Sequence, residues 1–144
     1  MQNKVRIGVL GCANIARKYT ISAFQKIENA EVVSIASREY EKAKEWAVQF
    51  AIRAEKSYDS LVESSDVDAL YIPLPIGLHK EWILKAAQNG KHIIVEKSLA
   101  GDFDSVKEIV EICQKSGVVL YENFMCDFHP QHHKVLSLIA SGSI

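Results

Sequence analysis

Short apolar runs alternate with longer amphipathic stretches along most of this sequence. Five such runs read VRIGVL (5–10), VVSIAS (32–37), ALYIPLP (69–75), HIIVE (92–96) and VVLYEN (118–123). The stretches between them repeat their apolar positions with the period of a helix. Strands that alternate with helices are typical of a parallel sheet, and runs that are apolar on both faces indicate a sheet covered on each side. The pattern therefore predicts a doubly wound α/β domain.

Glycine and aspartate residues mark where two of the helices begin and end. Gly90 follows a helix predicted over Leu78–Asn89, and Gly117 follows one predicted over Asp102–Ser116. Both glycines stand where a left-handed residue ends a helix, and Asp102 is suited to cap the start of the second helix. We expect the apolar face of residues 78–89 to pack on the sheet.

The composition indicates one globular core. The chain has 144 residues, of which 48% are hydrophobic and 24% charged, enough for a single domain. A formal net charge of -1 without single-sign blocks argues against nucleic-acid binding. No apolar run approaches the roughly 20 residues that span a bilayer, and the first residues lack a signal-peptide pattern. Since the three cysteines show no paired spacing, we expect no disulfide framework, no metal site and a cytoplasmic location.

The first strand leads into a turn of small residues and then a helix. Within GVLGCANIA (8–16), the small residues Gly11, Ala13 and Ala16 stand at the three positions of a G-x-G-x-x-G fingerprint. Small residues let a pyrophosphate approach the amides at a helix N-terminus, where the helix dipole favours its charge. We predict that Gly11, Ala13, Asn14 and Ile15 bind a nicotinamide dinucleotide. An ordinary tight turn without a ligand is the alternative.

Ser37 ends the second run and Arg38 follows it, at the position that separates NAD binders from NADP binders. An acidic side chain there would bind the adenosine ribose and repel a 2′-phosphate. A hydroxyl followed by a guanidinium suits a phosphate instead, so the pair favours NADP and leaves NAD open. The alternative is a surface Arg38 paired with Glu39 or Glu41.

The next strand end points to the same edge of the sheet. Pro73 and Leu74 close the run at 69–75, and ligands of open α/β sheets bind along this edge. We expect both residues to line the cofactor cleft. His79 either lines the nicotinamide side of the cleft or simply occupies the first turn of the following helix.

Glu96 ends the run at 92–96, and Lys97 follows it directly. An ammonium beside a carboxylate at this edge can protonate a carbonyl oxygen that gains charge as hydride arrives. Taken without further information, such a pair is more often a surface ion pair.

Five segments in order resemble the Gfo/Idh/MocA family of oxidoreductases: GVLGCANIA, SIASREYEKA, YIPLPIGLH, GKHIIVEKSLA and ENFMCDFHPQH. The resemblance covers the whole chain. It implies a dinucleotide-binding Rossmann domain over residues 1–122 and, over residues 123–144, the crossover into a second α/β domain that supplies much of the substrate pocket. We expect that second domain to be truncated here, this chain alone to be inactive, and the full-length protein to form a homo-oligomer.

By the same resemblance, Lys97 corresponds to the lysine of a Glu-Lys-Pro motif, the usual acid or proton relay, with Glu96 beside it. The stretch from Glu122 to His132 is most similar to ketoreductases of nucleotide-linked deoxysugars and to related sugar dehydrogenases. The resemblance therefore implies an NADP-dependent oxidoreductase that exchanges hydride with a carbohydrate hydroxyl or ketone.

Three positions depart from the family pattern. Ala13 replaces the second glycine of the fingerprint, Ile76 replaces an asparagine after Pro-x-Pro, and Ser98 replaces the proline after Lys97. These departures leave a second hypothesis open, a dinucleotide-binding or sensing module that does not turn over a substrate.

Overall fold

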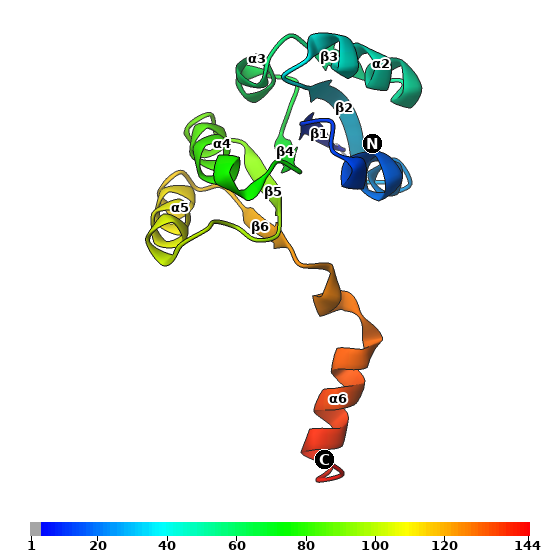
Figure 1. The fold of residues 1–144 in the computed structure, drawn as a ribbon, viewed down its shortest axis with the longest axis vertical. Coiled ribbons are helices and arrows are strands. Elements are labelled where there is room, and N and C mark those ends of the chain that lie inside the picture. Colours follow the sequence, from blue (N-terminus) through cyan, green and yellow to red (C-terminus); the bar gives the residue numbers. More distant parts are fainter. Residues whose placement is uncertain (1–3) are drawn as a thin grey trace.

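A six-stranded parallel sheet forms the centre of the computed structural model, which describes residues 4–144 (Figure 1). The strand order is β3-β2-β1-β4-β5-β6, with every neighbouring pair parallel. This is the order of the doubly wound Rossmann fold, as the alternating pattern predicted. The strands are β1 (Val5–Leu10), β2 (Ala30–Ala36), β3 (Arg53–Glu55), β4 (Ala69–Ile72), β5 (His92–Glu96) and β6 (Leu120–Asn123).

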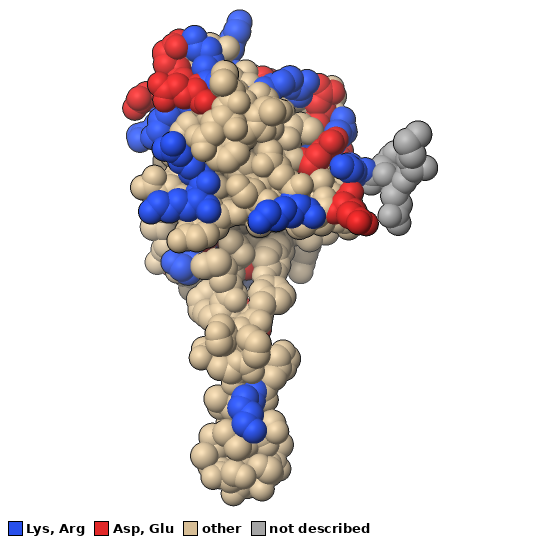
Figure 2. Space-filling view, turned by 90° about the vertical axis from the view of Figure 1, so that its right-hand side faces the viewer, with Lys and Arg blue, Asp and Glu red and all other residues tan. Residues whose placement is uncertain are grey.

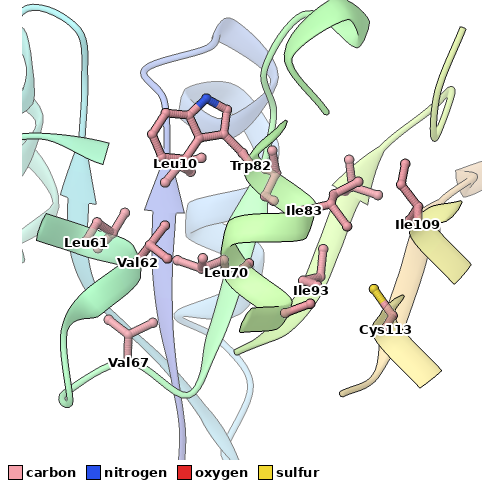
Figure 3. Packing of buried hydrophobic residues seen from close by; sticks show 14 of the residues in the cluster. Leu10, Leu61, Val62, Val67, Leu70, Trp82, Ile83, Ile93, Ile109 and Cys113 are labelled. Atoms are coloured by element: carbon pink, nitrogen blue, oxygen red, sulfur yellow. The ribbon is translucent and has the colours of Figure 1, made fainter. Parts of the chain in front are cut away.

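Helices cover the two faces of the sheet through separate apolar clusters. One face packs against α3 (Tyr58–Glu63), α4 (Ile76–Gln88) and α5 (Phe103–Lys115), with Leu10, Leu70 and Trp82 in its core (Figure 3). The other face packs against the helical segment at residues 16–24 and against α2 (Tyr40–Phe50), around Ile7 and Tyr71. The helical segments are η1 (Ala16–Thr20, a π-helical turn), α1 (Ile21–Phe24), α2 (Tyr40–Phe50), α3 (Tyr58–Glu63), α4 (Ile76–Gln88), α5 (Phe103–Lys115), η2 (Met125–Phe128, a 3₁₀ turn) and α6 (Pro130–Ala140).

The helix-capping predictions are confirmed, and one boundary differs. Asp102 accepts a hydrogen bond from the Ser105 amide at 2.8 Å, and Gly90 and Gly117 have φ of 67° and 68°. Helix α4 begins at Ile76, two residues before the predicted start. Pro75 is the N-cap of this helix. The first backbone amides of a helix have no partner within it, so the missing N–H of Pro75 costs the helix no hydrogen bond.

Strand β3 is absent from the five apolar runs of the sequence. It is three residues long, contains Arg53 and Glu55, and pairs only with β2 at the edge of the sheet. An edge strand with one neighbour needs no continuous apolar run. Its hydrogen bonds to β2 define it, and hydrophobic patterning cannot reveal them.

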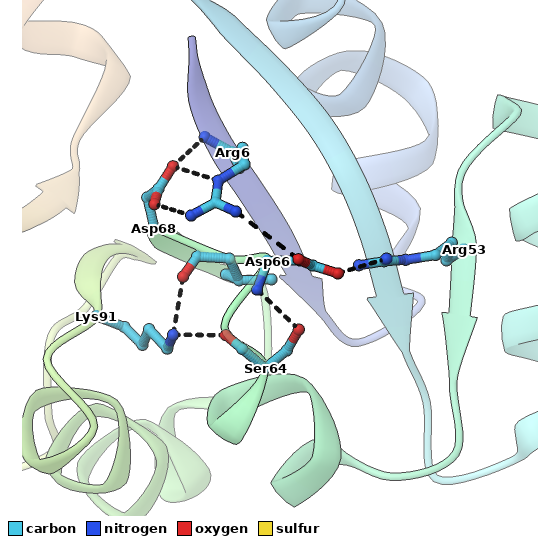
Figure 4. Close-up of polar contacts among 7 residues, drawn as sticks. Arg6, Arg53, Ser64, Asp66, Asp68 and Lys91 are labelled. Atoms are coloured by element: carbon cyan, nitrogen blue, oxygen red, sulfur yellow. Dashed lines mark hydrogen bonds and ion pairs between the residues drawn. The ribbon is translucent and has the colours of Figure 1, made fainter. Parts of the chain in front are cut away.

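The amino-terminal edge of the sheet is fixed by ion pairs (Figure 4). The Arg6 guanidinium donates to both Asp68 oxygens, at 2.9 Å and 2.6 Å. Asp66 lies between Arg6 and Arg53, at 3.9 Å and 2.6 Å. Hydrogen bonding from Arg6 lowers the pKa of Asp68 to about 2. These pairs hold the loop before β4 at the edge opposite the strand ends that carry the predicted site.

The last residues leave the sheet as an extension (Figure 1). After β6 the chain passes through η2 into α6, which protrudes from the sheet and exposes Leu136 and Ile139. Figure 2 shows few charged side chains on this extension. Within residues 4–144, no helix is both long and apolar enough to cross a bilayer. The assignment of residues 123–144 to a domain crossover stays a prediction.

Candidate cofactor site

A pocket opens at the carboxyl edge of the sheet, where β1, β2 and β4 end. Six residues predicted to bind a dinucleotide line it together: Gly11, Ala13, Ser37, Arg38, Pro73 and Leu74. The fold therefore unites three strand ends that are far apart in the sequence, at the edge where doubly wound sheets bind ligands. The other predicted residues do not line this pocket: Asn14, Ile15, His79, Glu96 and Lys97.

The turn after β1 is built so that only glycine fits its first position. Gly11 has φ of 122°, and a β-carbon there would lie 2.7 Å from Cδ2 of Leu74. Ala16, at the third fingerprint position, is fully buried against the sheet. Asn14 and Ile15 begin the helix that follows. Small residues therefore serve a tight turn and close helix packing here, the two structural requirements of a dinucleotide fingerprint.

The polar end of the pocket carries two cations without ion pairs. Arg38 and Lys42 both line it, and neither forms a salt bridge within residues 4–144. Glu41, a predicted alternative partner of Arg38, pairs with Lys44 at 2.7 Å. Two free cations near the Ser37 hydroxyl make a donor set that suits a phosphate.

Lys42 was not among the predicted site residues. It belongs to the first turn of α2, whereas Arg38 precedes the extended N-cap Glu39 and lies outside the helix. Helical periodicity therefore does not link the two residues, and the only sequence signal for Lys42 is a cation close after the Ser37-Arg38 strand end.

Tyr58 lines the pocket from a distant part of the chain. It belongs to α3, after the short edge strand, and its ring meets Trp82 edge-on with centroids 5.0 Å apart. Burial raises the pKa of Tyr58 and, likewise, that of the Cys12 thiol in the same pocket. Both groups therefore keep their protons, and the Cys12 thiol donates its proton to the Lys42 carbonyl oxygen at 4.0 Å. No sequence signal pointed to Tyr58, since only the sheet order brings it here.

His79 is buried behind the pocket with 1% of its surface exposed. Its Nε2 lies 2.7 Å from the Leu74 carbonyl oxygen and its Nδ1 lies 2.9 Å from that of Ser98. A neutral imidazole donates to one of these two oxygens. Both ring nitrogens thus face backbone, which supports a role in joining the two loops. Contact between His79 and a cofactor stays a prediction.

Glu96 and Lys97 lie at the end of β5, next to the strand whose end borders the pocket. They form no ion pair with each other or with other groups of residues 4–144. Glu96 is half-buried, whereas Lys97 is exposed. The loop after Lys97 is held from both sides, because His79 meets the Ser98 carbonyl and Glu122 accepts from the Leu99 amide at 2.9 Å. Lys97 therefore projects from a braced loop and is free to meet a ligand.

The three departures from the family pattern fall at the ligand-facing edge. Ala13 lines the pocket. Ile76 is 44% exposed at the first position of α4. Ser98 adopts a cis peptide bond with Lys97. His79 contacts this loop at the Ser98 carbonyl oxygen, with serine in place of proline.

Potential metal ligands do not gather at this edge. Within residues 4–144, no group of three or more histidine, cysteine, aspartate or glutamate side chains is arranged to hold a metal ion.

Comparison with known proteins agrees with this geometry. A family model described as "Oxidoreductase family, NAD-binding Rossmann fold" (GFO_IDH_MocA) matches residues 5–124. That range begins at β1 and ends just after β6, so it covers the whole sheet and every predicted site residue.

Several characterised proteins resemble this chain over nearly its full length. A dTDP-3,4-didehydro-2,6-dideoxy-alpha-D-glucose 3-reductase of Actinomadura kijaniata is 39% identical over 142 residues, covering 99% of this chain and 43% of that protein. D-xylose 1-dehydrogenase (NADP(+)) 2 of Haloferax volcanii is 40% identical over 135 residues, which are 93% of this chain and 41% of that protein.

A solved structure shows the same fold with ligands bound. The 3-ketoreductase of A. kijaniata, in complex with NADP and TDP-benzene, superposes with a TM-score of 0.94 at 39% identity and covers 99% of this chain and 44% of its own. This chain therefore spans less than half the length of the relatives it matches.

Proposed function

Since this chain belongs to the Gfo/Idh/MocA oxidoreductase family, we propose that it is the NADP-binding part of an enzyme that exchanges hydride with a sugar. The substrate carries a hydroxyl or ketone group, and a nucleotide-linked deoxysugar fits the relatives' chemistry. The observation that carries the proposal is the pocket at the carboxyl edge, where the Gly11 turn and the free cations Arg38 and Lys42 meet.

The pocket supports NADP over NAD through its donor set. Ser37, Arg38 and Lys42 offer a hydroxyl, a guanidinium and an ammonium to one phosphate, in the place where NAD binders carry a carboxylate. Glu39 is the one carboxylate that lines the pocket, and its amide donates to Ser37 Oγ at 3.3 Å. The turn at Gly11 and Ala13 would hold the pyrophosphate at the start of the helix.

Lys97 is the proposed acid. When bound, the dinucleotide supplies or accepts the hydride. Lys97 would hold a proton at Nζ, hydrogen-bond the substrate oxygen, and transfer that proton as the oxygen gains charge during reduction. His79 meets the Ser98 carbonyl and Glu122 accepts from the Leu99 amide, so the backbone directly after Lys97 is anchored.

In this proposal, the domain that completes the substrate pocket is not among residues 4–144. The relatives are more than twice as long as this chain, and we propose that residues 123–144 lead into the substrate domain of a longer protein. Turnover then needs that domain, whereas cofactor binding rests on residues 4–122.

A titration of this chain with NADPH and NADH tests the proposal. We expect NADPH to quench protein fluorescence and to bind more tightly than NADH. Binding of neither cofactor to this chain would reject the proposal, and tighter binding of NADH would reject the NADP assignment.

A further inference from the structure

A hydrogen-bonded series of four side chains crosses the sheet at Glu96. Oγ1 of Thr20 lies 3.0 Å from the Tyr71 hydroxyl. That hydroxyl donates to Oε1 of Glu96 at 2.7 Å, and the Asn123 amide nitrogen donates to the same oxygen at 2.8 Å. The strands contribute one residue each, because Tyr71 belongs to β4, Glu96 to β5 and Asn123 to β6.

The register of the sheet explains why these groups meet. Tyr71 pairs with Ile94, and Glu96 pairs with Asn123. Since side chains two residues apart on a strand share a face, Ile94 and Glu96 point the same way. Thr20 reaches this face because its helix covers the sheet there, where Phe24 packs edge-on against Tyr71 with centroids 5.9 Å apart.

Chemistry fixes the direction of each hydrogen bond. An ionised carboxylate only accepts, so Tyr71 gives its single hydroxyl proton to Glu96. Tyr71 then has no proton left for Thr20, and the Thr20 hydroxyl must donate to Tyr71. The series therefore runs from Thr20 through Tyr71 and ends on Glu96.

Tyr71 is a fixed donor in this series. Its side chain is fully buried, and burial, together with the neighbouring Glu96 carboxylate, raises its pKa. The phenol therefore keeps its proton and does not relay it to solvent.

The two oxygens of Glu96 consequently differ. Oε1 accepts two hydrogen bonds, which occupies both of its lone pairs. Oε2 accepts none from any residue in the part of the chain that the structure describes. Glu96 immediately precedes Lys97, so the oxygen left open belongs to the same strand end as the proposed acid.

We infer that Tyr71 is a positioning residue that, together with Asn123, holds Oε1 of Glu96 so that Oε2 accepts a hydrogen bond from a hydroxyl of a bound polyol. The nature of that polyol, a ribose or a sugar, rests on the proposed function. Glu96 acts in this arrangement as an acceptor that orients the ligand, and the proton comes from Lys97.

A double-mutant cycle in the full-length protein tests the inference. The variants are Tyr71→Phe, Glu96→Gln and both together, with Tyr40→Phe as the control for losing a phenol hydroxyl on the exposed side of α2. We expect Tyr71→Phe to weaken binding about threefold to tenfold when Glu96 is present and less than about twofold when Gln replaces it.

Two readouts distinguish the possible ligands. A weaker Kd for NADPH identifies a ribose hydroxyl, whereas a raised KM for the sugar with unchanged NADPH affinity identifies a substrate hydroxyl. An equal loss in both Glu96 backgrounds, or a loss in neither, overturns the inference. Asn123→Ser provides a second test if Tyr71→Phe does not fold, because it removes the other donor to Oε1 at a partly exposed position. Its effect on binding must then depend on Glu96 in the same way.

A measurement without ligand separates this inference from the proposed function. In NMR spectra of this chain, the side-chain amide of Asn123 should shift in Tyr71→Phe and stay in place in Tyr40→Phe. If the wild-type chain binds no NADPH, the proposed function fails while the amide shift still reports on Glu96. An Asn123 amide that does not respond to Tyr71→Phe overturns the positioning role.

Discussion

Gly11 and Leu74 approach so closely that a β-carbon on Gly11 would lie 2.7 Å from Leu74 Cδ2. The turn after β1 and the loop after β4 are thus packed on each other, and His79 connects that second loop to Ser98. The candidate pocket and the Lys97 loop are therefore joined through Leu74 and His79.

Gly11→Ala should damage both folding and cofactor binding. The new methyl group would meet Leu74, at a φ of 122° that side chains rarely adopt, so we expect a loss of about 2 kcal/mol or more in the free energy of unfolding. Urea unfolding measures this loss. Gly77→Ala is the control, since Gly77 lies in α4 with nothing within 4 Å of a new methyl. It should be neutral or stabilise by up to about 1 kcal/mol, and equal losses in the two variants would contradict the packing argument.

Arg38→Ala and Lys42→Ala should each weaken NADPH binding and leave NADH binding nearly unchanged. In the proposed site each variant would remove one charge-assisted bond to the 2′-phosphate, which corresponds to about tenfold to hundredfold in Kd. Calorimetric titration with both cofactors measures the difference. Lys44→Ala on the same helix is the control, because Lys44 is paired with Glu41. Equal losses for NADPH and NADH would show that neither cation recognises the extra phosphate.

Lys97→Ala in the full-length protein should lower kcat by about 10²- to 10⁴-fold, the usual contribution of a general acid. NADPH affinity should change little, since Lys97 does not line the pocket that contains Arg38 and Lys42. Steady-state kinetics and cofactor titration separate the two effects. Lys80→Ala removes a lysine that pairs with Glu108 at 2.7 Å and should retain activity. Unchanged turnover in Lys97→Ala would remove the proposed acid.

His79→Gln should destabilise the chain by about 1–3 kcal/mol, because a buried carbonyl oxygen loses its donor. In the full-length protein it should also lower kcat more than it raises the Kd for NADPH, since the Lys97 loop loses its anchor at Ser98. Chemical unfolding and kinetics provide the two measurements. His132→Gln in the exposed helix α6 should stay within about 0.5 kcal/mol of the original. A His79 variant as stable as the His132 variant would argue against the bridging role.

Acid should weaken the amino-terminal edge of the sheet. Asp68 has a pKa of about 2 in the folded protein, below its ordinary value of 3.8. Its pairing with Arg6 therefore stabilises the fold fully at pH values above 3.8. That contribution is lost as the pH falls from about 4 towards 2. We expect about 1 kcal/mol or less, because both side chains are partly exposed. NMR titration of Asp68 measures the pKa directly. In Arg6→Gln it should rise towards 3.8, and an unchanged value would contradict the assigned cause.

The repeating pattern of the sequence predicted most of the fold, and the reasons are local. The apolar runs matched five of the six strands: four are interior strands, which must be apolar on both faces, and the fifth is the edge strand β6. Gly90, Gly117 and Asp102 marked helix ends because left-handed backbone and capping oxygens favour those residue types. Strand β3 was missed because a polar edge strand carries no such pattern.

The residues of the candidate site were likewise predicted only in part. Gly11, Ser37 and Arg38 could be recognised because each follows a strand, and strand ends meet at one edge in any doubly wound sheet. Lys42 was missed although it follows the second strand end closely in the sequence, and Tyr58 carried no sequence signal at all.

The sequence by itself determined the alternation of strands and helices, the small-residue turn at Gly11 and the chemistry at each strand end. Only the tertiary structure decided that Arg38 is free of Glu41, that His79 faces two backbone carbonyls, and that Tyr71, Glu96 and Asn123 share hydrogen bonds. The physical reason is that periodicity and capping act between residues close in the chain. Ion pairs and buried hydrogen bonds depend on which strands become neighbours and on the register between them.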